Sequence, residues 1–409
     1  MQMEYKTDWE ETKIRYLAWW AHEDIGRPLI SVTAPRVDIS DEPSSKSKIY
    51  NRYDINTLKL SRMGFEPNIL SKPVGISERY TKDSILDKSK PLDPDGILNY
   101  WIDLDYIAAR NYYTMEHTFY GGEAFPVWTT VWPYPYHMSV PFFLGCTIDL
   151  GWYAGWLNPI VAGNGLEDVF KLKIDKTDNW WQFTLKALRR AAGESAGRCI
   201  PSIGAIGGCG DTLAALRGTE RLLFDVIERP EEVIAAENYL MDMWFDVYEE
   251  FYNILHDVSE GSTCFFELWS PGKFYAVHND FAYMISPKMF CDIFLPIIER
   301  QTAFLDHSIY HVDGEGNFAH VPALCELPNL QTLQIGPGEG KPSALHYMDI
   351  LKYVQNKKKN LWIHLLPEEI EAALANLSTK GLFINTYCNT EKEARDLLGN
   401  IGRWSRVKP

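Results

Sequence analysis

From about residue 199 onward, short apolar runs alternate along the chain with amphipathic stretches. Short apolar runs that are each followed by a helix predict a parallel sheet covered on both faces. Seven such runs, together with an eighth at 28–34, give the number of strands that closes a barrel. The seven runs are 200–206, 263–268, 275–279, 308–312, 330–335, 361–365 and 382–386.

The stretches between these runs predict helices, and some of them carry a proline where a helix begins. Pro230, Pro287 and Pro367 stand where a first-turn proline is tolerated, because the N–H that proline lacks has no partner there. Two more helical patterns occur earlier in the chain, at 8–22 and 101–117. The predicted helices of the regular part are 211–217, 219–227, 231–256, 287–305, 344–356, 367–377 and 391–398.

These elements predict an α/β fold, a (β/α)8 TIM barrel forming a single domain over residues 1–409. An irregular N-terminal extension, 1–100, packs on a barrel core at 100–400, and the polar stretch 38–48 is an exposed loop. A doubly wound open sheet is the alternative, but no glycine-rich turn follows a first strand as a dinucleotide site requires. The weakly charged segment 139–163 has the length of a membrane span. Its prolines and glycines instead predict a buried loop and pocket wall.

Charge and cysteine content narrow the range of partners and compartments. The net charge of -15 argues against binding nucleic acid or an anionic membrane, because no basic surface gathers phosphates. The 7 scattered cysteines do not resemble a disulfide framework, which favours a reducing compartment. With no apolar stretch of signal-peptide type at 1–9, we expect a cytoplasmic protein that acts on a small molecule. A symmetric homodimer is compatible with this picture.

The chain is rich in aromatic residues, with 14 Trp, 22 Tyr and 19 Phe. Many of them gather in the stretch 128–137, which has too many rings and prolines for a regular element. Trp128, Trp132 and Tyr134 are therefore candidates for a substrate-binding wall that suits a methylated amine, a sugar or another apolar-faced ligand. Packing against the barrel mouth is the alternative interpretation.

Three predicted strands end in polar residues, and the carboxyl ends of barrel strands are where active sites lie. One strand ends at His278, Asn279 and Asp280, and another ends at His311, Val312 and Asp313. Since residues two apart in a strand point the same way, His311 and Asp313 share a direction. An imidazole beside a carboxylate is either a metal-ligand pair or an acid/base pair, and the alternative is a strand end that caps the next helix.

The other polar residues at strand ends have two interpretations each. Asp280 is either catalytic or a partner for the turn that follows it. Cys388 is either a zinc ligand or a small buried apolar residue. Asp211 follows the glycine-rich stretch 207–210, where capping of its own helix is the default interpretation. His278 and Gln334, near the ends of two predicted strands, are candidates for substrate binding.

Several motifs resemble those of the uroporphyrinogen decarboxylase superfamily, in a branch described as corrinoid-associated or trimethylamine-corrinoid-like. Asp280 followed by FAYMISPKMFCDIFLP at 281–296 matches the superfamily's Asp and ISPxMFxxxxLP-like pattern. The resemblance implies a barrel of that type, in which Asp280 faces the substrate. The branch is matched further by GGEAFP at 121–126, GCGDTLAALRG at 208–218, IYHVDG at 309–314, His320 and LQTLQIGPG at 330–338.

The resemblance implies one of two activities. The superfamily contains decarboxylases and zinc-dependent methyltransferases that move a methyl group between a corrinoid and a thiol or another acceptor. The methyltransferases resemble this chain at His311, but they carry a cysteine where this chain has Asp313, and Cys388 stands where a further thiolate is expected. The decarboxylases carry an Arg-rich clamp for a substrate with many carboxylates. Here that region offers Arg27, in a chain that is acidic overall.

The leading hypothesis is therefore a methyltransferase with Asp280, His311 and Asp313 as catalytic residues. His311, Asp313 and Cys388 would hold zinc, and a corrinoid such as methylcobalamin would be the substrate or would be carried by a partner protein. Glycoside hydrolysis with Asp280 paired to Asp313 or Glu315 is a second hypothesis. A decarboxylase and a non-catalytic barrel that binds a small ligand or a corrinoid protein are the remaining alternatives.

Overall fold

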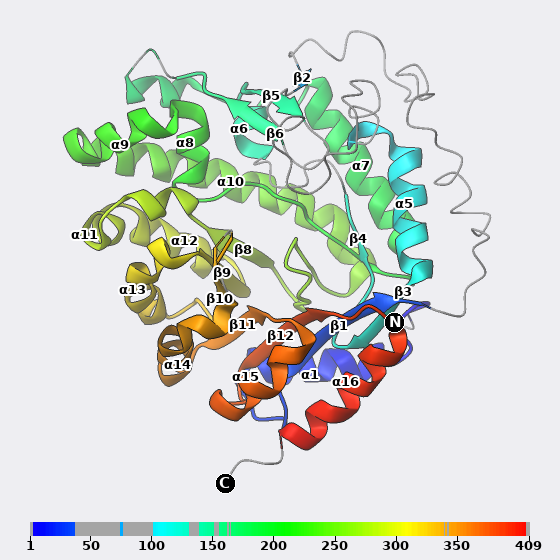
Figure 1. Ribbon diagram of the computed structural model, residues 1–409. Coiled ribbons are helices and arrows are strands. Elements are labelled where there is room, and N and C mark those ends of the chain that lie inside the picture. Colours follow the sequence, from blue (N-terminus) through cyan, green and yellow to red (C-terminus); the bar gives the residue numbers. More distant parts are fainter. Residues whose placement is uncertain are drawn as a thin grey trace.

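A mostly parallel sheet of seven strands forms the centre of the computed structural model, which describes residues 3–36, 74–76, 101–130, 139–150, 155–161, 163, 165–338, 340–341 and 343–405 (Figure 1). The strand order is β3-β1-β12-β11-β10-β9-β8. Their bounds are β1 Leu29–Pro35, β3 Thr118–Gly122, β8 Phe274–His278, β9 His307–Asp313, β10 Thr332–Gly336, β11 Asn360–His364 and β12 Leu382–Tyr387.

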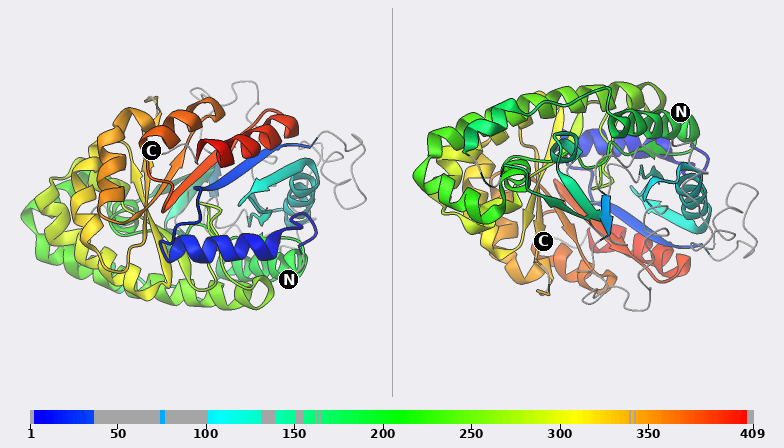
Figure 2. Two further views of the ribbon diagram at one scale, coloured as in Figure 1. Left: turned by 90° about the horizontal axis from the view of Figure 1, so that it is seen from below. Right: turned by 90° about the horizontal axis from the view of Figure 1, so that it is seen from above.

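Every neighbouring pair from β8 to β1 is parallel, and only the edge strand β3 runs antiparallel to its neighbour. The parallel strands are mostly buried on both faces, as their apolar sequences predict, and β10 is buried at all five positions, whereas the edge strand β3 is mostly half-buried. The sheet curves, and the helices that follow β9 to β12 lie on its outer side (Figure 2). The carboxyl ends of β8, β9 and β10 consequently lie next to one another.

Two smaller sheets accompany the central one. The short strands β4 (Val127–Trp128) and β7 (Ile200–Pro201) pair in parallel, and Ser202 continues this ladder with a parallel bridge to Thr263. The other sheet has the order β2-β5-β6, with bounds β2 Val74–Ile76, β5 Thr147–Leu150 and β6 Gly155–Asn158.

The helices alternate with the strands over the second half of the chain. The α-helices are α1 Trp9–Trp20, α5 Leu104–His117, α6 Ser139–Phe143, α7 Asn179–Ser195, α8 Asp211–Arg217, α9 Thr219–Glu228, α10 Pro230–Ser259, α11 Pro287–Met289, α12 Leu295–Phe304, α13 Val321–Glu326, α14 Met348–Asn356, α15 Ile370–Asn376 and α16 Glu391–Trp404. Short 3-10 or π-helical turns are η4 Leu166–Lys171, η5 Asp280–Met284, η6 Phe290–Phe294, η7 Glu315–His320, η8 Ala344–Tyr347 and η9 Pro367–Glu369. Within the described ranges, no helix combines the length and apolar character needed to cross a membrane.

Most predicted elements are confirmed, and the prolines open their helices as expected. Pro230, Pro287 and Pro367 stand in the first turn of α10, α11 and η9. Six predicted strands correspond to β1, β8, β9, β10, β11 and β12 with ends shifted by no more than two residues. The helix predicted at 287–305 is divided by the π-helical turn η6.

Two predicted strands are wrong in extent. The run 200–206 is a strand only at β7, and 263–268 contributes only the bridge at Thr263. The chain turns there instead, because the Glu267 N–H donates to the Cys264 carbonyl at 2.9 Å and Glu267 has φ 52. In the described residues the ladders run as separate sheets rather than one continuous ring of eight strands, in an α/β fold with a mostly parallel sheet.

The segment 139–163, predicted as a buried loop and pocket wall, contributes α6, β5 and β6 rather than a loop. It does form pocket wall, because Trp156, Leu157 and Pro159 line a cavity. The predicted exposed loop at 38–48 lies outside the described residues.

The N-terminal part of the chain is tied to the sheet by a buried carboxylate. Glu123 is fully buried and accepts hydrogen bonds from Arg27 Nη2 at 2.6 Å, Arg15 Nε at 2.6 Å and the Ile30 backbone N–H at 2.7 Å. Burial alone would raise the pKa of Glu123, but the guanidinium groups of Arg27 and Arg15 outweigh it and hold this pKa below its ordinary value. This carboxylate joins α1, β1 and the segment after β3.

We expect Glu123→Gln to lower the free energy of unfolding by about 3 kcal/mol at pH 7, because it leaves two guanidinium groups without their shared carboxylate. The lowered pKa makes this contribution present above the unfolded pKa of about 4.3 and lost as the pH falls through the folded pKa. Urea denaturation at several pH values measures both effects. The exposed Glu368→Gln is the control, and a loss below about 1 kcal/mol at pH 7 would contradict the prediction.

Candidate functional site

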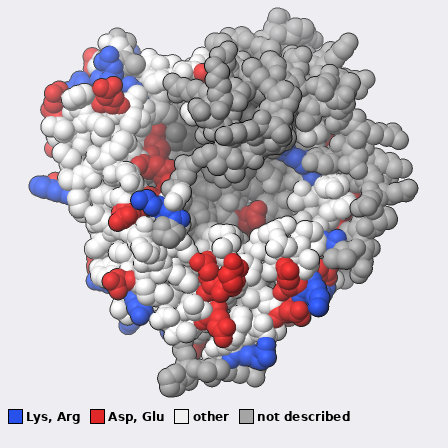
Figure 3. All heavy atoms as spheres, viewed as in Figure 1, with Lys and Arg blue, Asp and Glu red and all other residues white. Residues whose placement is uncertain are grey.

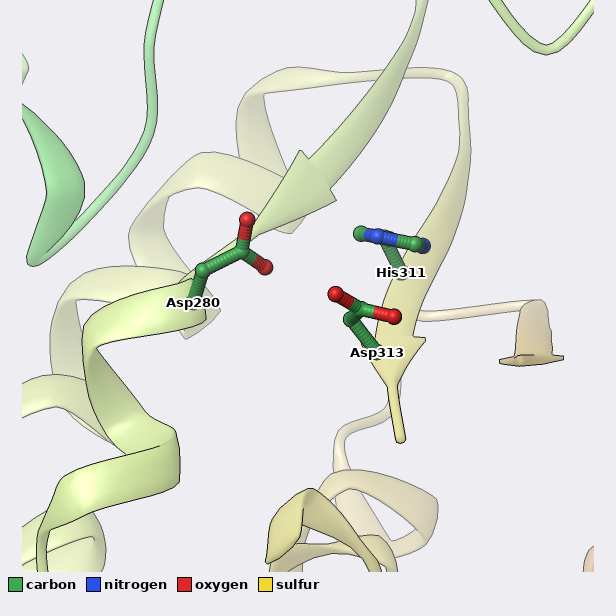
Figure 4. Close-up of side chains that lie close together, drawn as sticks. All are labelled: Asp280, His311 and Asp313. Atoms are coloured by element: carbon green, nitrogen blue, oxygen red, sulfur yellow. The ribbon is translucent and has the colours of Figure 1, made fainter. Parts of the chain in front are cut away.

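Three predicted catalytic side chains meet at the carboxyl ends of two adjacent strands. Asp280 begins η5 directly after β8, while His311 and Asp313 lie on β9 on either side of the buried Val312. One ligand atom from each of Asp280, His311 and Asp313 lies within 4.8 Å of the other two (Figure 4). Asp280 and Asp313 are exposed and His311 is half-buried, so a ligand can reach the group.

Gln334 holds the His311 ring from the neighbouring strand. Parallel pairing of β9 with β10 sets Gln334 opposite His311 and Gly336 opposite Asp313. Gln334 Oε1 lies at hydrogen-bond distance from His311 Nδ1, and as an acceptor it requires the proton on Nδ1. The Nε2 lone pair of His311 is then free for a metal ion or a proton.

The nitrogen and two oxygens of this group are a donor set that suits a divalent metal. Zinc takes histidine nitrogen and carboxylate oxygen, and ideal tetrahedral ligands lie about 3.4 Å apart. The separations of up to 4.8 Å here would need to close by up to about 1.4 Å, which side-chain rotation can supply. His311 and Asp313, with Asp280 close by, leave at least one of the four coordination positions open, as catalytic zinc sites do.

Behind this group, a buried Asp–His pair links β8 to the start of α8. Asp211 Oδ2 lies 3.2 Å from His278 Nδ1, and its two carboxylate oxygens accept the backbone N–H groups of Asp280 at 3.0 Å and Phe281 at 2.9 Å. Asp211 was expected to cap its own helix. It instead caps η5 and thereby fixes the start of the turn that carries Asp280.

Burial shifts the pKa values of Asp211 and His278 in the directions that favour their neutral forms. Burial, helped by the nearby charge of Asp280, raises the pKa of Asp211 to about 7. Burial also lowers the pKa of His278, although the charge of Asp280 acts in the opposite direction. Such a pair can take up or release a proton near neutral pH beside the reacting group.

A cavity of about 890 Å³ opens above these residues and reaches from β6 to the ends of β11 and β12. The space-filling view shows a hollow in this face of the molecule, with acidic side chains in and beside it (Figure 3). Its charged lining residues are Asp211, Glu267 and Asp280, and no Lys or Arg of the described residues lines it. Its aromatic lining residues are Trp156, Phe265, Phe266, Phe281 and Trp362. The cavity therefore favours a cation with apolar surface over an anion.

The predicted substrate-binding residues differ in where they lie relative to the cavity. His278 lines the cavity, whereas Gln334 contacts it indirectly through His311. The prediction for Trp128 is wrong, because this residue is 2% exposed in β4 and packs edge-on against Tyr112, at 5.5 Å between ring centroids. Trp132 and Tyr134 lie outside the described residues.

Cys388 is not brought to the group formed by Asp280, His311 and Asp313. Its side chain is 1% exposed and its backbone N–H donates to the Thr33 carbonyl at 2.9 Å, which places it beside β1. Burial raises the pKa of the Cys388 thiol, and a nearby glutamate adds to the effect. In the described residues Cys388 has the environment of a small buried apolar residue, the alternative expected from the sequence.

Sequence reasoning missed Glu267, a cavity-lining carboxylate. The stretch FFELW at 265–269 reads as part of a buried strand, so its acidic residue gave no reason to expect a turn. The one clue in the sequence was that Glu267 is a charged residue inside an otherwise apolar run, where a buried strand would not place it.

Comparison with known proteins supports the fold. No protein-family model and no curated protein matches the sequence. The solved structure of a methyltransferase from Methanosarcina mazei matches with a TM-score of 0.52 and 12% identity, covering 96% of this chain and 98% of that chain. A likeness at this identity shows a shared α/β fold. The resemblance to the uroporphyrinogen decarboxylase superfamily remains a prediction.

Glu237, a buried acid on α10, contacts the backbone next to Asp211, and its ionisation should make the stability of the protein depend on pH. Its Oε1 accepts the Gly210 N–H at 3.0 Å, at the residue before Asp211. Burial raises the pKa of Glu237 to about 8, while the contacts with Gly210 and Cys209 act against this rise.

Because the folded pKa exceeds the unfolded value of about 4.3, the native protein loses stability as the pH rises from about 4 to about 8. Glu237→Gln keeps an acceptor for Gly210 and cannot ionise. We expect it to match the native protein within about 1 kcal/mol at pH 5 and to exceed it by at least about 1 kcal/mol at pH 8.5. Denaturant titrations at both pH values measure the difference, and equal pH profiles would contradict the assignment.

Proposed function

We propose that the protein is a metal-assisted methyltransferase built on a (β/α)8 barrel of the uroporphyrinogen decarboxylase type. The observation that carries the proposal is the convergence of Asp280, His311 and Asp313 at adjacent strand ends, within 4.8 Å. The structural likeness to a methyltransferase over 96% of the chain supports it. The in-register parallel strands β8 to β12 and β1 make up most of such a barrel, and β4 and β7 would supply its other two strands.

In this proposal His311 Nε2 and the Asp313 carboxylate hold a divalent metal such as zinc, with Asp280 at the edge of its coordination sphere. The metal would supply a Lewis acid that lowers the pKa of an acceptor thiol. Asp313 in place of a cysteine makes the ligand set harder, which zinc accepts. Cys388 is not needed as a ligand.

The residues of the chain would then accept the proton of the thiol and orient the methyl donor. Asp280 would accept the proton that the thiol loses, because its exposed carboxylate lies beside His311 and Asp313. The thiolate attacks the methyl carbon, a carbon–sulfur bond forms, and the bond to the leaving atom breaks with its electron pair on that atom. The donor is a small methylated molecule, or a methylcorrinoid that is free or carried by a partner protein.

A polycarboxylate substrate fits this cavity poorly. Arg27 is the basic residue in the region that corresponds to the decarboxylases' Arg-rich clamp, but its guanidinium group is paired with Glu123. The cavity lining is acidic. Glycoside hydrolysis is the second candidate, because Asp280 and Asp313 lie close enough to act as a pair of carboxylates. A non-catalytic barrel would show neither activity.

The proposal is tested by metal content and turnover. Protein purified in metal-free buffer and reloaded with zinc should retain about one equivalent, and His311→Ala and Asp313→Asn should lose it. The zinc-loaded protein should demethylate methylcobalamin with one member of a thiol panel, followed by the absorbance of the cobalamin. His346→Ala, an exposed histidine outside the group, is the control.

No bound metal, with no effect of either variant, would remove the metal-based mechanism. Release of nitrophenol from aryl glycosides, lost in Asp280→Asn, would favour hydrolysis instead.

The contact between Gln334 and His311 gives a separate expectation. Gln334→Met keeps the shape of the side chain but removes the acceptor that fixes the His311 ring, so zinc affinity should fall about 10- to 100-fold. Gln334→Glu keeps an acceptor and should retain the affinity. Competition with a chromophoric chelator measures both constants, and equal affinities for the native protein and Gln334→Met would contradict the assigned role.

A further inference from the structure

Glu267 lies at a strained position where the backbone turns its side chain into the cavity. Its φ of 52 is in the left-handed region, which residues other than glycine adopt only at an energetic cost. The turn between Cys264 and Glu267 separates two buried stretches, and Glu267 itself is exposed. That exposed surface is cavity wall, because Glu267 lines both the large cavity and a neighbouring one of about 600 Å³.

The Glu267 carboxylate has no hydrogen-bond or ion-pair partner among the described residues, which is unusual for an acid so surrounded by protein. The protein on either side of this cavity wall removes the carboxylate from part of its water, and this desolvation raises the pKa of Glu267. Arg110 lines the smaller cavity but is not among the groups that shift this pKa. A positive charge in the large cavity would satisfy this carboxylate.

Aromatic rings stand next to Glu267 on the side of the proposed metal site. Phe266 lies edge-on to Trp362 at 5.2 Å between centroids, and its ring is 5.6 Å from that of His311. Trp156 lines the same cavity from β6. Ring faces attract quaternary ammonium groups, and a carboxylate beside them adds a counter-ion. The rings also connect Glu267 to His311.

We propose that the cavity binds a small organic cation of the quaternary ammonium class, with Glu267 as its counter-ion and Phe266 and Trp362 as its aromatic walls. Binding of this cation does not depend on the proposed function. Only its role as the methyl donor rests on the proposed function. As the methyl carbon bonds to the thiolate, the carbon–nitrogen bond breaks, its electron pair stays on nitrogen and a neutral amine leaves. Loss of the positive charge would then weaken the hold of Glu267 on the product.

The test compares choline with 3,3-dimethyl-1-butanol, a neutral molecule of the same shape, by calorimetric titration of the zinc-loaded protein. Choline and tetramethylammonium should each bind at least about tenfold more tightly than the neutral molecule. Glu267→Gln should remove this preference while it leaves binding of the neutral molecule unchanged. Glu371→Gln, on the exposed face of α15, is the matched control and should behave like the native protein.

Equal binding of choline and its neutral counterpart, or no binding of either cation at millimolar concentration, would overturn the inference. So would a preference that survives in Glu267→Gln, with circular dichroism confirming that the variant is folded. His311→Ala separates the two proposals, because it should lose zinc and turnover but keep the choline preference. If native protein prefers choline yet transfers no methyl group, only the proposed function fails.

Discussion

The parallel register of three adjacent strands is the constraint on which the candidate site depends. His278 on β8 pairs with His311 on β9, which pairs with Gln334 on β10. With the strands held at this register, polar residues that are far apart in the sequence come to one edge of the sheet. A shift of one residue in β9 would turn His311 and Asp313 away from the cavity and turn Val312 toward it.

Electrostatic imbalance is the second property of the site. Three carboxylates line the large cavity without a Lys or Arg from the described residues. The protein accommodates them in different ways. Asp211 accepts two backbone N–H groups and contacts His278, while Asp280 lies near His311 and Asp313. Glu267 lines the cavity beside aromatic residues. This imbalance is the reason for proposing a metal ion and an organic cation as the bound groups.

Fold and sequence are conserved to different degrees between this chain and its structural neighbour. At 12% identity the chain has the fold of a methyltransferase from Methanosarcina mazei along nearly its whole length, although no family model matches its sequence. Buried apolar positions tolerate many sequences provided that volume and pattern are kept. A fold does not by itself imply a function, so the proposed activity rests on Asp280, His311 and Asp313 rather than on the fold.

Local pattern determined much of this protein by itself. Apolar runs and first-turn prolines predicted six strands of the sheet and the helices between them, and the two-residue period of a strand put His311 and Asp313 on one side. Contacts between distant segments decided the rest. The turn at Glu267, the burial of Trp128 and Cys388, and the attachment of Asp211 to η5 each depend on residues remote in the chain. The periodicity of apolar residues predicts which face of a strand or helix a residue occupies, but only tertiary packing decides which other residues that face contacts.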